Sequence, residues 1–292
     1  MGRWGPYYGG AMSANRVGAD SNELLFVKLG GSVITEKARE ETPRPGVIAR
    51  LGTEVASSLA ARPDLRLVLG HGSGSFGHMP ARRYGTRLGV QGREGWLGFA
   101  EVAAVAARLN RLVTGTFLAA GVPVWSLQPS ASALCRAGDL VSLDTGPVMG
   151  ALSRGLVPLL YGDVALDDAW GGTIISTEQI FAYLARHLRP TRLVLVGVVD
   201  GVFEGDPLRD PEARPVPLIS QDNWDAVRTS LGGSFATDVT GGMLAKVEEM
   251  VTLVQDLPGL SVHLISGERT GALASLLLDP EGAAGGTLIR WR

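Results

Sequence analysis

The sequence predicts an α/β fold in which helices cover both faces of a mostly parallel sheet. Short apolar runs alternate along the chain with longer stretches of helical periodicity, and this alternation is typical of βα units. Several of the apolar runs are continuous, as in strands that are buried on both faces. The chain has 292 residues, of which 45% are hydrophobic and 19% charged, so it can bury a large core.

The strands are predicted from the apolar runs. The first, residues 24–29, is apolar except for Lys28, and the second, residues 65–69, leads into a glycine-rich segment. Further strands are expected at residues 122–127, 157–161, 193–199, 262–265 and 287–291. Ligands of such sheets bind at the carboxyl ends of the strands, so the residues that follow these runs are the candidates for a functional site.

The helices are predicted between the strands, at residues 45–61, 99–120, 177–188, 222–231, 242–255 and 270–278. The segment from Gly172 to Glu178 is expected to start one of them, because Ser176 or Thr177 can cap a helix and Glu178 suits its first turn. Residues 201–217 contain several prolines and mixed charges, and they are predicted to form a long surface loop.

Charge and composition exclude several classes of partner. Lys+Arg number 27 against 29 Asp+Glu, and no long basic run is present, so nucleic acid is not expected. No apolar stretch has membrane-spanning length, so a membrane is not expected either. The single Cys135 excludes an intrachain disulfide and is interpreted as a buried structural thiol.

Residues 1–22 differ in composition from the rest of the chain. They are rich in glycine, tyrosine and small polar residues and lack the apolar core of a secretory signal. We therefore expect a disordered tail at residues 1–22, one domain at residues 23–292, and the cytoplasm as the default location.

The most informative segment follows the second strand and runs from Gly70 through Ser75 to His78. A loop with so little side-chain bulk lets backbone N–H groups approach an anion closely, and His78 can donate a further hydrogen bond. The glycines at 72, 74 and 77 match the dinucleotide-binding pattern literally. However, an earlier strand already has its own glycine loop, and no acidic residue closes a further strand about twenty residues on. We therefore predict a phosphate guest rather than a nicotinamide cofactor.

Lysines accompany two other glycine segments. Taken alone, Lys28 is better interpreted as a lysine extending from a strand end. Gly30-Gly31-Ser32, which follows closely, changes this interpretation, because it places backbone donors beside the ammonium, as suits a polyphosphate. Gly241 and Gly242 are expected at a helix N-terminus, which is a phosphate site, and Lys246 points back towards it from one turn inside. Gly162, after the strand at 157–161, allows close approach by a ligand.

Together these segments resemble the amino acid kinase family. The resemblance rests on Lys28-Leu-Gly-Gly-Ser-Val-Ile-Thr35 with Lys37, on Gly72-Ser-Gly-Ser-Phe-Gly-His78, on Tyr161-Gly-Asp-Val164, on Val199-Asp200-Gly201-Val202, and on Asp238-Val-Thr-Gly-Gly242 with Lys246. It covers about residues 24–292 in the family's order. The Ser-Phe-Gly-His loop is similar to that of the family members that phosphorylate isopentenyl phosphate.

The resemblance implies an open three-layer αβα sandwich, a homodimer, and transfer of the ATP γ-phosphoryl group to isopentenyl phosphate with isopentenyl diphosphate and ADP as products. It implies catalytic roles for Lys28, Lys37, His78, Glu178 and Lys246. It implies acceptor contacts from Ser73, Gly74, Gly77, His78 and Gly162, and ATP contacts from Lys28, Gly30, Gly31, Ser32, Gly74, Asp200, Gly201, Gly241, Gly242 and Lys246. Mg²⁺ is expected to accompany ATP and to be held mainly by its oxygens and water, without a metal site on the protein.

Two positions depart from the family pattern. Ser73 stands where the family commonly has glycine, and Thr177-Glu178 stands where glycine and aspartate are usual, which makes the orienting role of Glu178 less certain. Three alternatives stay open: a related kinase acting on another phosphate, phosphonate or carboxylate; a nucleotide-binding regulatory protein without turnover; and an NAD-binding dehydrogenase.

Overall fold

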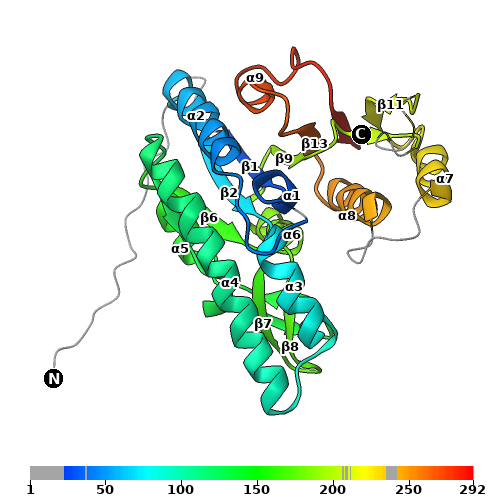
Figure 1. Ribbon diagram of the computed structural model, residues 1–292. Coiled ribbons are helices and arrows are strands. Elements are labelled where there is room, and N and C mark those ends of the chain that lie inside the picture. Colours follow the sequence, from blue (N-terminus) through cyan, green and yellow to red (C-terminus); the bar gives the residue numbers. More distant parts are fainter. Residues whose placement is uncertain are drawn as a thin grey trace, which may run out of the picture.

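A mostly parallel sheet of eight strands forms the middle layer (Figure 1). The computed structural model describes residues 23–36, 38–205, 207, 210, 212–234 and 242–291, without the side chains of residues 78, 232–234 and 242. The strand order is β12-β14-β13-β9-β1-β2-β6-β3. Neighbours from β13 to β3 are parallel, whereas β14 runs antiparallel to β13. The predicted fold class is therefore confirmed.

The strands of this sheet lie close to the predicted runs. Their bounds are β1 Leu24–Leu29, β2 Arg66–His71, β3 Val124–Ser126, β6 Val157–Tyr161, β9 Arg192–Gly197, β12 Leu218–Ile219, β13 Ser261–Ser266 and β14 Thr287–Arg290. β1 lies in the interior of the sheet, where Leu25 and Val27 face one core cluster and Phe26 faces the other. Burial on both faces explains why this run is continuously apolar.

Helices cover the two faces of the sheet as separate layers. The layer over Leu25 and Val27 contains α1 Gly31–Ile34, α2 Pro45–Ala61, α4 Gly92–Ala119 and α9 Ala272–Leu278. The layer over Phe26 contains α5 Gly146–Leu152, α6 Thr177–Leu188, α7 Trp224–Ser234 and α8 Gly242–Asp256. Within the described ranges, no helix combines the length and the apolar character needed to cross a membrane.

A second, four-stranded sheet lies beside α3 and α4 (Figure 1) and was not predicted. It contains β4 Leu134–Arg136, β5 Asp139–Ser142, β7 Asp163–Asp167 and β8 Gly171–Ile175. The segment from Gly172, expected to start a helix, is thus a strand, and the helix starts only after the Ser176 cap. These strands are short and partly exposed, so they lack the long apolar run by which a central strand is recognised.

Cys135 lies in β4 and is fully buried. Burial, followed by the charges of Asp167 and Asp139, raises the pKa of its thiol to about 11. Because the thiolate is the reactive form, this cysteine is inert at neutral pH, in agreement with the structural interpretation.

Three further segments differ markedly from the prediction, and the helices α1 and α5 were not predicted. Residues from Gly74 onward form helix α3, Gly74–Tyr84, where a glycine loop was expected. α4 begins at Gly92 rather than at residue 99, with Glu94 in its first turn. The expected loop at 201–217 contains a short antiparallel pair, β10 Val202–Phe203 and β11 Pro215–Val216. Glycines and prolines lower the intrinsic propensity of these segments to form regular secondary structure. Packing against neighbouring elements stabilises the helices and strands that form there nevertheless.

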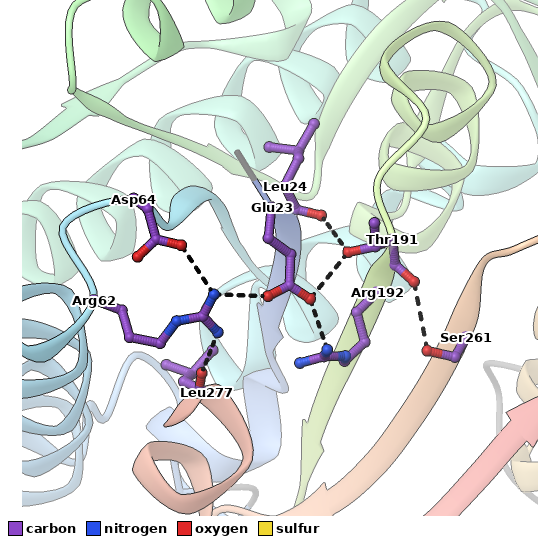
Figure 2. A network of polar contacts seen from close by, with 8 residues as sticks. All are labelled: Glu23, Leu24, Arg62, Asp64, Thr191, Arg192, Ser261 and Leu277. Carbon is purple, nitrogen blue, oxygen red and sulfur yellow. Dashed lines mark hydrogen bonds and ion pairs between the residues drawn. The ribbon is translucent and has the colours of Figure 1, made fainter. Parts of the chain in front are cut away.

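A charged network joins elements at the amino ends of the strands (Figure 2). The Glu23 carboxylate accepts hydrogen bonds from Arg192 at 2.6 Å and from Thr191 at 3.2 Å, and it pairs with Arg62 at 3.0 Å. Arg62 also donates to Asp64 and to the carbonyl of Leu277 at the end of α9. This network occupies the amino ends of the strands, so the candidate site is sought at the opposite, carboxyl ends.

Candidate active site

The candidate residues gather at the carboxyl ends of neighbouring parallel strands. Lys28 is the penultimate residue of β1, and Gly72 follows β2 directly. Gly162 follows β6, and Asp200 comes three residues after the end of β9. β1 pairs with both β2 and β9, and β2 pairs with β6, so these ends are adjacent at one edge of the sheet.

Lys28 and Glu178 form an ion pair at the centre of this edge. The Lys28 ammonium donates to Oε1 of Glu178, and their side chains are only 12% and 10% exposed. Glu178 lies in the first turn of α6, which Ser176 caps in a reciprocal capping box with Gln179. The cap determines where α6 begins and thereby places Glu178 opposite β1.

Electrostatics connect Glu178 with a second lysine. Burial raises the pKa of Glu178, but the charge and hydrogen bond of Lys28 and the charge of Lys246 outweigh burial and lower it overall. Lys246 is partly buried near the start of α8. The Glu178 carboxylate therefore lies within range of the charges of both lysines.

The two glycine loops pack backbone against backbone beside this pair. A Cβ on Gly31 would lie 2.3 Å from the Gly74 nitrogen, and a Cβ on Gly72 would lie 3.0 Å from the Gly31 nitrogen. Gly74 also has a φ of +50°, in the left-handed region. Glycine is required at these positions because any larger side chain would separate the loops.

Thr35 clamps the same contact and was missed in the sequence. Its hydroxyl donates to the Gly31 carbonyl at 2.7 Å and accepts the backbone N–H of Ser75 at 2.9 Å. Thr35 is 1% exposed, so both bonds are shielded from water. It lies inside the Lys28–Thr35 motif, but only the folded chain shows that it joins the first glycine segment to the second.

The second glycine segment presents a helix N-terminus. Ser73 occupies the N-cap position of α3 without a side-chain cap bond. N–H groups in the first turn of a helix favour an anion. In α3, the Ser75 N–H already donates to Thr35 and the Phe76 N–H donates to the Ser73 carbonyl at 3.1 Å. A Cβ on Gly77 would meet the Ser73 hydroxyl at 2.3 Å, so Gly77 allows the serine to lie against the helix. His78 belongs to α3, and its side chain is outside the described part of the structure.

His71 supports the loop from the inside. Its Nδ1 lies 3.1 Å from the Gly72 carbonyl, its Nε2 lies 3.2 Å from Nδ2 of Asn110, and its ring stacks on Tyr161. Burial lowers its pKa to about 4, with a smaller contribution from the charge of Lys28. The ring is therefore neutral at pH 7, donating from Nδ1 and accepting at Nε2.

Gly162 lies against the start of α6. Its N–H donates to the His71 carbonyl at 3.1 Å, and the Thr177 hydroxyl donates to the same oxygen at 2.7 Å. From the sequence, Thr177 was predicted only as a possible helix cap. Its contact with the end of β2 was not predicted. Its bond joins the β2 end to α6 and so supports the position of Glu178.

Two expected ATP contacts have their polar groups engaged by the protein. The Gly30 N–H donates to the Val196 carbonyl at 2.8 Å, so it is not available to a polyphosphate. The Asp200 carboxylate accepts the N–H of Ser266 at 2.9 Å and pairs with Arg269 at 3.4 Å. Both residues therefore hold strand ends in place.

The remaining predicted residues are only partly described. Gly201 has a φ of +99° and packs against Thr287, and Ser32 lies in α1. Gly242 is the first residue of α8. Lys37 and Gly241 lie outside the described residues, as does the expected tail at 1–22.

Comparison with known proteins supports the resemblance to the amino acid kinase family. The sequence profile of the amino acid kinase family matches residues 23–266. The chain is 34% identical to an isopentenyl phosphate kinase of Methanothermobacter thermautotrophicus, over 88% of this chain and 96% of that protein. It is 33% identical to an isopentenyl phosphate kinase of Haloferax volcanii, over 91% and 98% of the two chains. A solved structure of isopentenyl phosphate kinase superposes with a TM-score of 0.77 at 30% identity, covering 91% of this chain and all of that one.

Proposed function

The chain belongs to the amino acid kinase family, and we propose that it transfers the γ-phosphoryl group of ATP to isopentenyl phosphate, releasing ADP and isopentenyl diphosphate. The observation that carries this proposal is the Lys28–Glu178 pair with Lys246 beside it, next to the joined glycine loops. A dehydrogenase has no need of this arrangement. A regulatory protein that only senses nucleotide does not need two lysines around one carboxylate.

The chemistry requires no general base. The second pKa of a phosphate monoester is about 6, so the acceptor is mostly a dianion at neutral pH and is already a nucleophile. An acceptor oxygen forms a bond to the γ-phosphorus while the bond to the β,γ-bridging oxygen breaks and ADP leaves. The difficulty lies in bringing two anions together, and Lys28 and Lys246 offset their repulsion. Glu178 orients both ammonium groups.

The acceptor phosphate is assigned to the second glycine loop. The N-terminus of α3, with Ser73, Gly74 and Gly77, offers backbone donors there, and His78 adds a side-chain donor. The ATP phosphates are assigned to Gly31, Ser32 and the start of α8 at Gly242. Lys37 and Gly241 complete the proposed contacts.

The described residues contain no group of three or more His, Cys, Asp or Glu side chains that could hold a metal ion. Mg²⁺ that enters with ATP would therefore be held mainly by phosphate oxygens and water, where it neutralises phosphate charge. A cytoplasmic location stays a prediction.

A homodimer is part of the proposal. β3 is an edge strand of the large sheet, and Trp125 on it is 46% exposed. On α4, which contacts β3, Leu112 and Leu118 are 46% and 53% exposed. Exposed apolar side chains of this size favour a protein partner, and a second copy would cover the edge of the sheet.

A panel of acceptors tests the reaction. ADP release is measured with isopentenyl phosphate, acetylglutamate and UMP, and the product is identified by mass spectrometry. We expect ATP-dependent isopentenyl diphosphate from the first and no ADP release above the acceptor-free rate from the others. Turnover of acetylglutamate or UMP with none of isopentenyl phosphate would overturn the proposal.

The role of His78 is tested separately. The variant His78→Ala should lower kcat/KM for isopentenyl phosphate by on the order of a hundredfold, as for loss of one well-placed donor. The KM for ATP should change little, because His78 is assigned to the acceptor. Turnover like that of the wild type would remove His78 from the mechanism.

A further inference from the structure

Asn110 is a buried amide on α4 to which the proposed reaction assigns no role. It is 2% exposed and lies on the helix face that packs into the core, where Leu109 and Val113 are its apolar neighbours. Burying an amide in such surroundings is unfavourable unless its donor and acceptor groups are bonded. The bonds that Asn110 makes therefore indicate why an amide stands here instead of an apolar side chain.

The amide of Asn110 connects two strands that lie on either side of β6. Its Oδ1 accepts the hydroxyl of Ser126, the last residue of β3, at 2.5 Å. Its Nδ2 lies 3.2 Å from Nε2 of His71, the last residue of β2. The Thr114 hydroxyl, one turn later, donates to the Asn110 backbone carbonyl at 2.7 Å. Both ends of the amide are therefore held in place.

The Gly72 carbonyl determines the direction of these hydrogen bonds. This oxygen can only accept, and it lies 3.1 Å from Nδ1 of His71, so Nδ1 carries the ring proton. Burial lowers the pKa of His71 to about 4, so the ring is neutral at pH 7 and its Nε2 has a lone pair. The NH₂ group of Asn110 donates to that lone pair, which leaves Oδ1 to accept from Ser126.

Gly72 is thereby held on both sides. Its N–H donates to the Leu29 carbonyl at 3.0 Å, and its carbonyl accepts from the His71 ring. The carbonyl and the N–H of a trans peptide point in opposite directions, so the N–H of Ser73 points away from His71. The described part of the chain provides no acceptor for this N–H. Ser73 therefore presents a fixed backbone donor at the second glycine loop.

We propose that Asn110 is a positioning residue for the acceptor phosphate and acts through His71. Its NH₂ group keeps the proton of the ring at Nδ1, where that proton fixes the Gly72 carbonyl. The fixed peptide directs the Ser73 N–H towards the phosphate. The inference rests on the proposed function, in which the acceptor phosphate binds at this loop.

The protonation of the His71 ring tests the first step. The chain has four histidines, so long-range proton–nitrogen NMR spectra of histidine-labelled protein resolve each ring, and His71→Asn assigns the signals. We expect a protonated Nδ1 and an unprotonated Nε2 in the wild type at pH 7. Asn110→Asp keeps the shape of the side chain but replaces its donor with an acceptor, so Nε2 should gain a proton. A wild-type ring protonated at Nε2, or an unchanged ring in Asn110→Asp, would overturn the inference.

A pH profile of the same variant tests the effect on the loop. In Asn110→Asp the carboxylate raises the pKa of His71 and draws a proton to Nε2, so Nδ1 is protonated only while the ring is a cation. When the ring becomes neutral, a lone pair at Nδ1 faces the Gly72 carbonyl and the bond is lost. We expect kcat/KM for isopentenyl phosphate, as a ratio to the wild type, to fall by on the order of tenfold between about pH 6 and pH 9. A ratio that does not depend on pH would contradict the proposed role.

Other titrating groups near the ring are common to both proteins. The charge of Lys28 on β1 acts on His71, Tyr161 on β6 stacks on it, and Glu178 on α6 pairs with Lys28. The acceptor phosphate also titrates, at about pH 6. Taking the ratio of variant to wild type removes these shared contributions and leaves that of the Asn110 substitution.

A control separates positioning from stability. Val113→Ala removes a fully buried side chain one turn after Asn110, so it should lower the free energy of unfolding without changing the KM for isopentenyl phosphate. If Asn110→Asp does not fold, Asn110→Leu replaces it, because leucine also lacks the donor. We then expect the KM for isopentenyl phosphate to rise by on the order of tenfold and the KM for ATP to stay constant. An unchanged acceptor KM, or an equal rise in Val113→Ala, would overturn the inference.

The NMR spectra need no substrate, so they remain informative if the proposed reaction fails. If no acceptor in the panel is phosphorylated, calorimetric titration with inorganic phosphate replaces the kinetics. Asn110→Leu should then bind phosphate on the order of tenfold more weakly than the wild type does. Equal affinities, or no binding to the wild type, would overturn the inference.

Discussion

Glu178 is the residue that fixes the charge arrangement of the site. It accepts from Lys28, feels the charge of Lys246, and has a lowered pKa. A depressed acid pKa means that the ion pair is present above the ordinary value of 4.5 and is lost as pH falls through the lower folded value. The pair is therefore intact at any pH at which the enzyme would be assayed.

Substituting Glu178 tests its orienting role. Glu178→Gln removes the charge that both lysines share and should lower kcat by on the order of a hundredfold, measured at saturating ATP. Glu178→Asp, which restores the residue type usual in the family, should keep most of the activity because the carboxylate remains. If the glutamine variant turned over like the wild type, the lysines would not depend on Glu178.

His71 makes the stability of the protein sensitive to acid. Its pKa is lowered to about 4, so the folded state resists the proton that the unfolded chain accepts near 6.5. Its stabilising effect is complete above pH 6.5 and is lost as pH falls towards 4. Between pH 7 and pH 5 this loss is about 2 kcal/mol.

Urea unfolding at pH 7 and pH 5 measures this effect. Between pH 7 and pH 5, the free energy of unfolding of His71→Asn should fall by about 2 kcal/mol less than that of the wild type. His187→Asn is the control, because His187 is exposed and its Nδ1 lies 2.8 Å from the Tyr183 carbonyl one helical turn earlier. His263, whose pKa burial also lowers to about 4, stays in both variants. Equal slopes in the two variants would contradict the assignment.

At the scale of elements, the site depends on the contact between the two glycine segments. Gly31 and Gly74 touch through backbone atoms, and Thr35 holds the contact with two hydrogen bonds. The contact joins the start of α1 to the start of α3, and therefore the proposed ATP side to the proposed acceptor side. A shift of about 1 Å between reacting groups can cost a hundredfold in rate.

The variant Gly31→Ala should separate these elements. Its Cβ would lie 2.3 Å from the Gly74 nitrogen, which is backbone and cannot rotate away. We expect a loss of stability of about 1–3 kcal/mol from overpacking and a fall in kcat/KM of on the order of a hundredfold. Gly46→Ala, in α2 with nothing within 4 Å of the added carbon, is the matched control and should change neither quantity adversely. Unaltered kinetics in Gly31→Ala would show that the loops tolerate separation.

For the whole molecule, the open edge at β3 leads to a prediction of assembly. Trp125→Glu combined with Leu112→Glu places two charges on the surface proposed for the second copy. We expect the wild type to sediment as a dimer and this variant as a monomer in analytical ultracentrifugation. Leu278→Glu is the control, because Leu278 is similarly exposed, at 42%, but lies at the end of α9. A wild type that sediments as a monomer would remove the homodimer from the proposal.

Much of the architecture could be predicted because it is local in the chain. β1 and α2 have the predicted bounds, since a continuous apolar run and helical periodicity are properties of the segment itself. The strand-end rule also predicted that Lys28 and Gly162 would lie at one edge. α3 was missed because its glycines and Pro80 lower helix propensity, whereas its packing against α4 is a property of the fold.

By itself, the sequence determined the βα order, the burial of the central strands and the residue types that suit phosphate, because periodicity, apolar content and glycine conformational freedom belong to each segment. Only the tertiary structure decided how these residues act. It pairs Lys28 with Glu178 across 150 positions of the chain, engages the Gly30 N–H with Val196, and joins the glycine loops through Thr35. Such contacts depend on strand order and helix register, which bring distant segments together and which no local pattern contains.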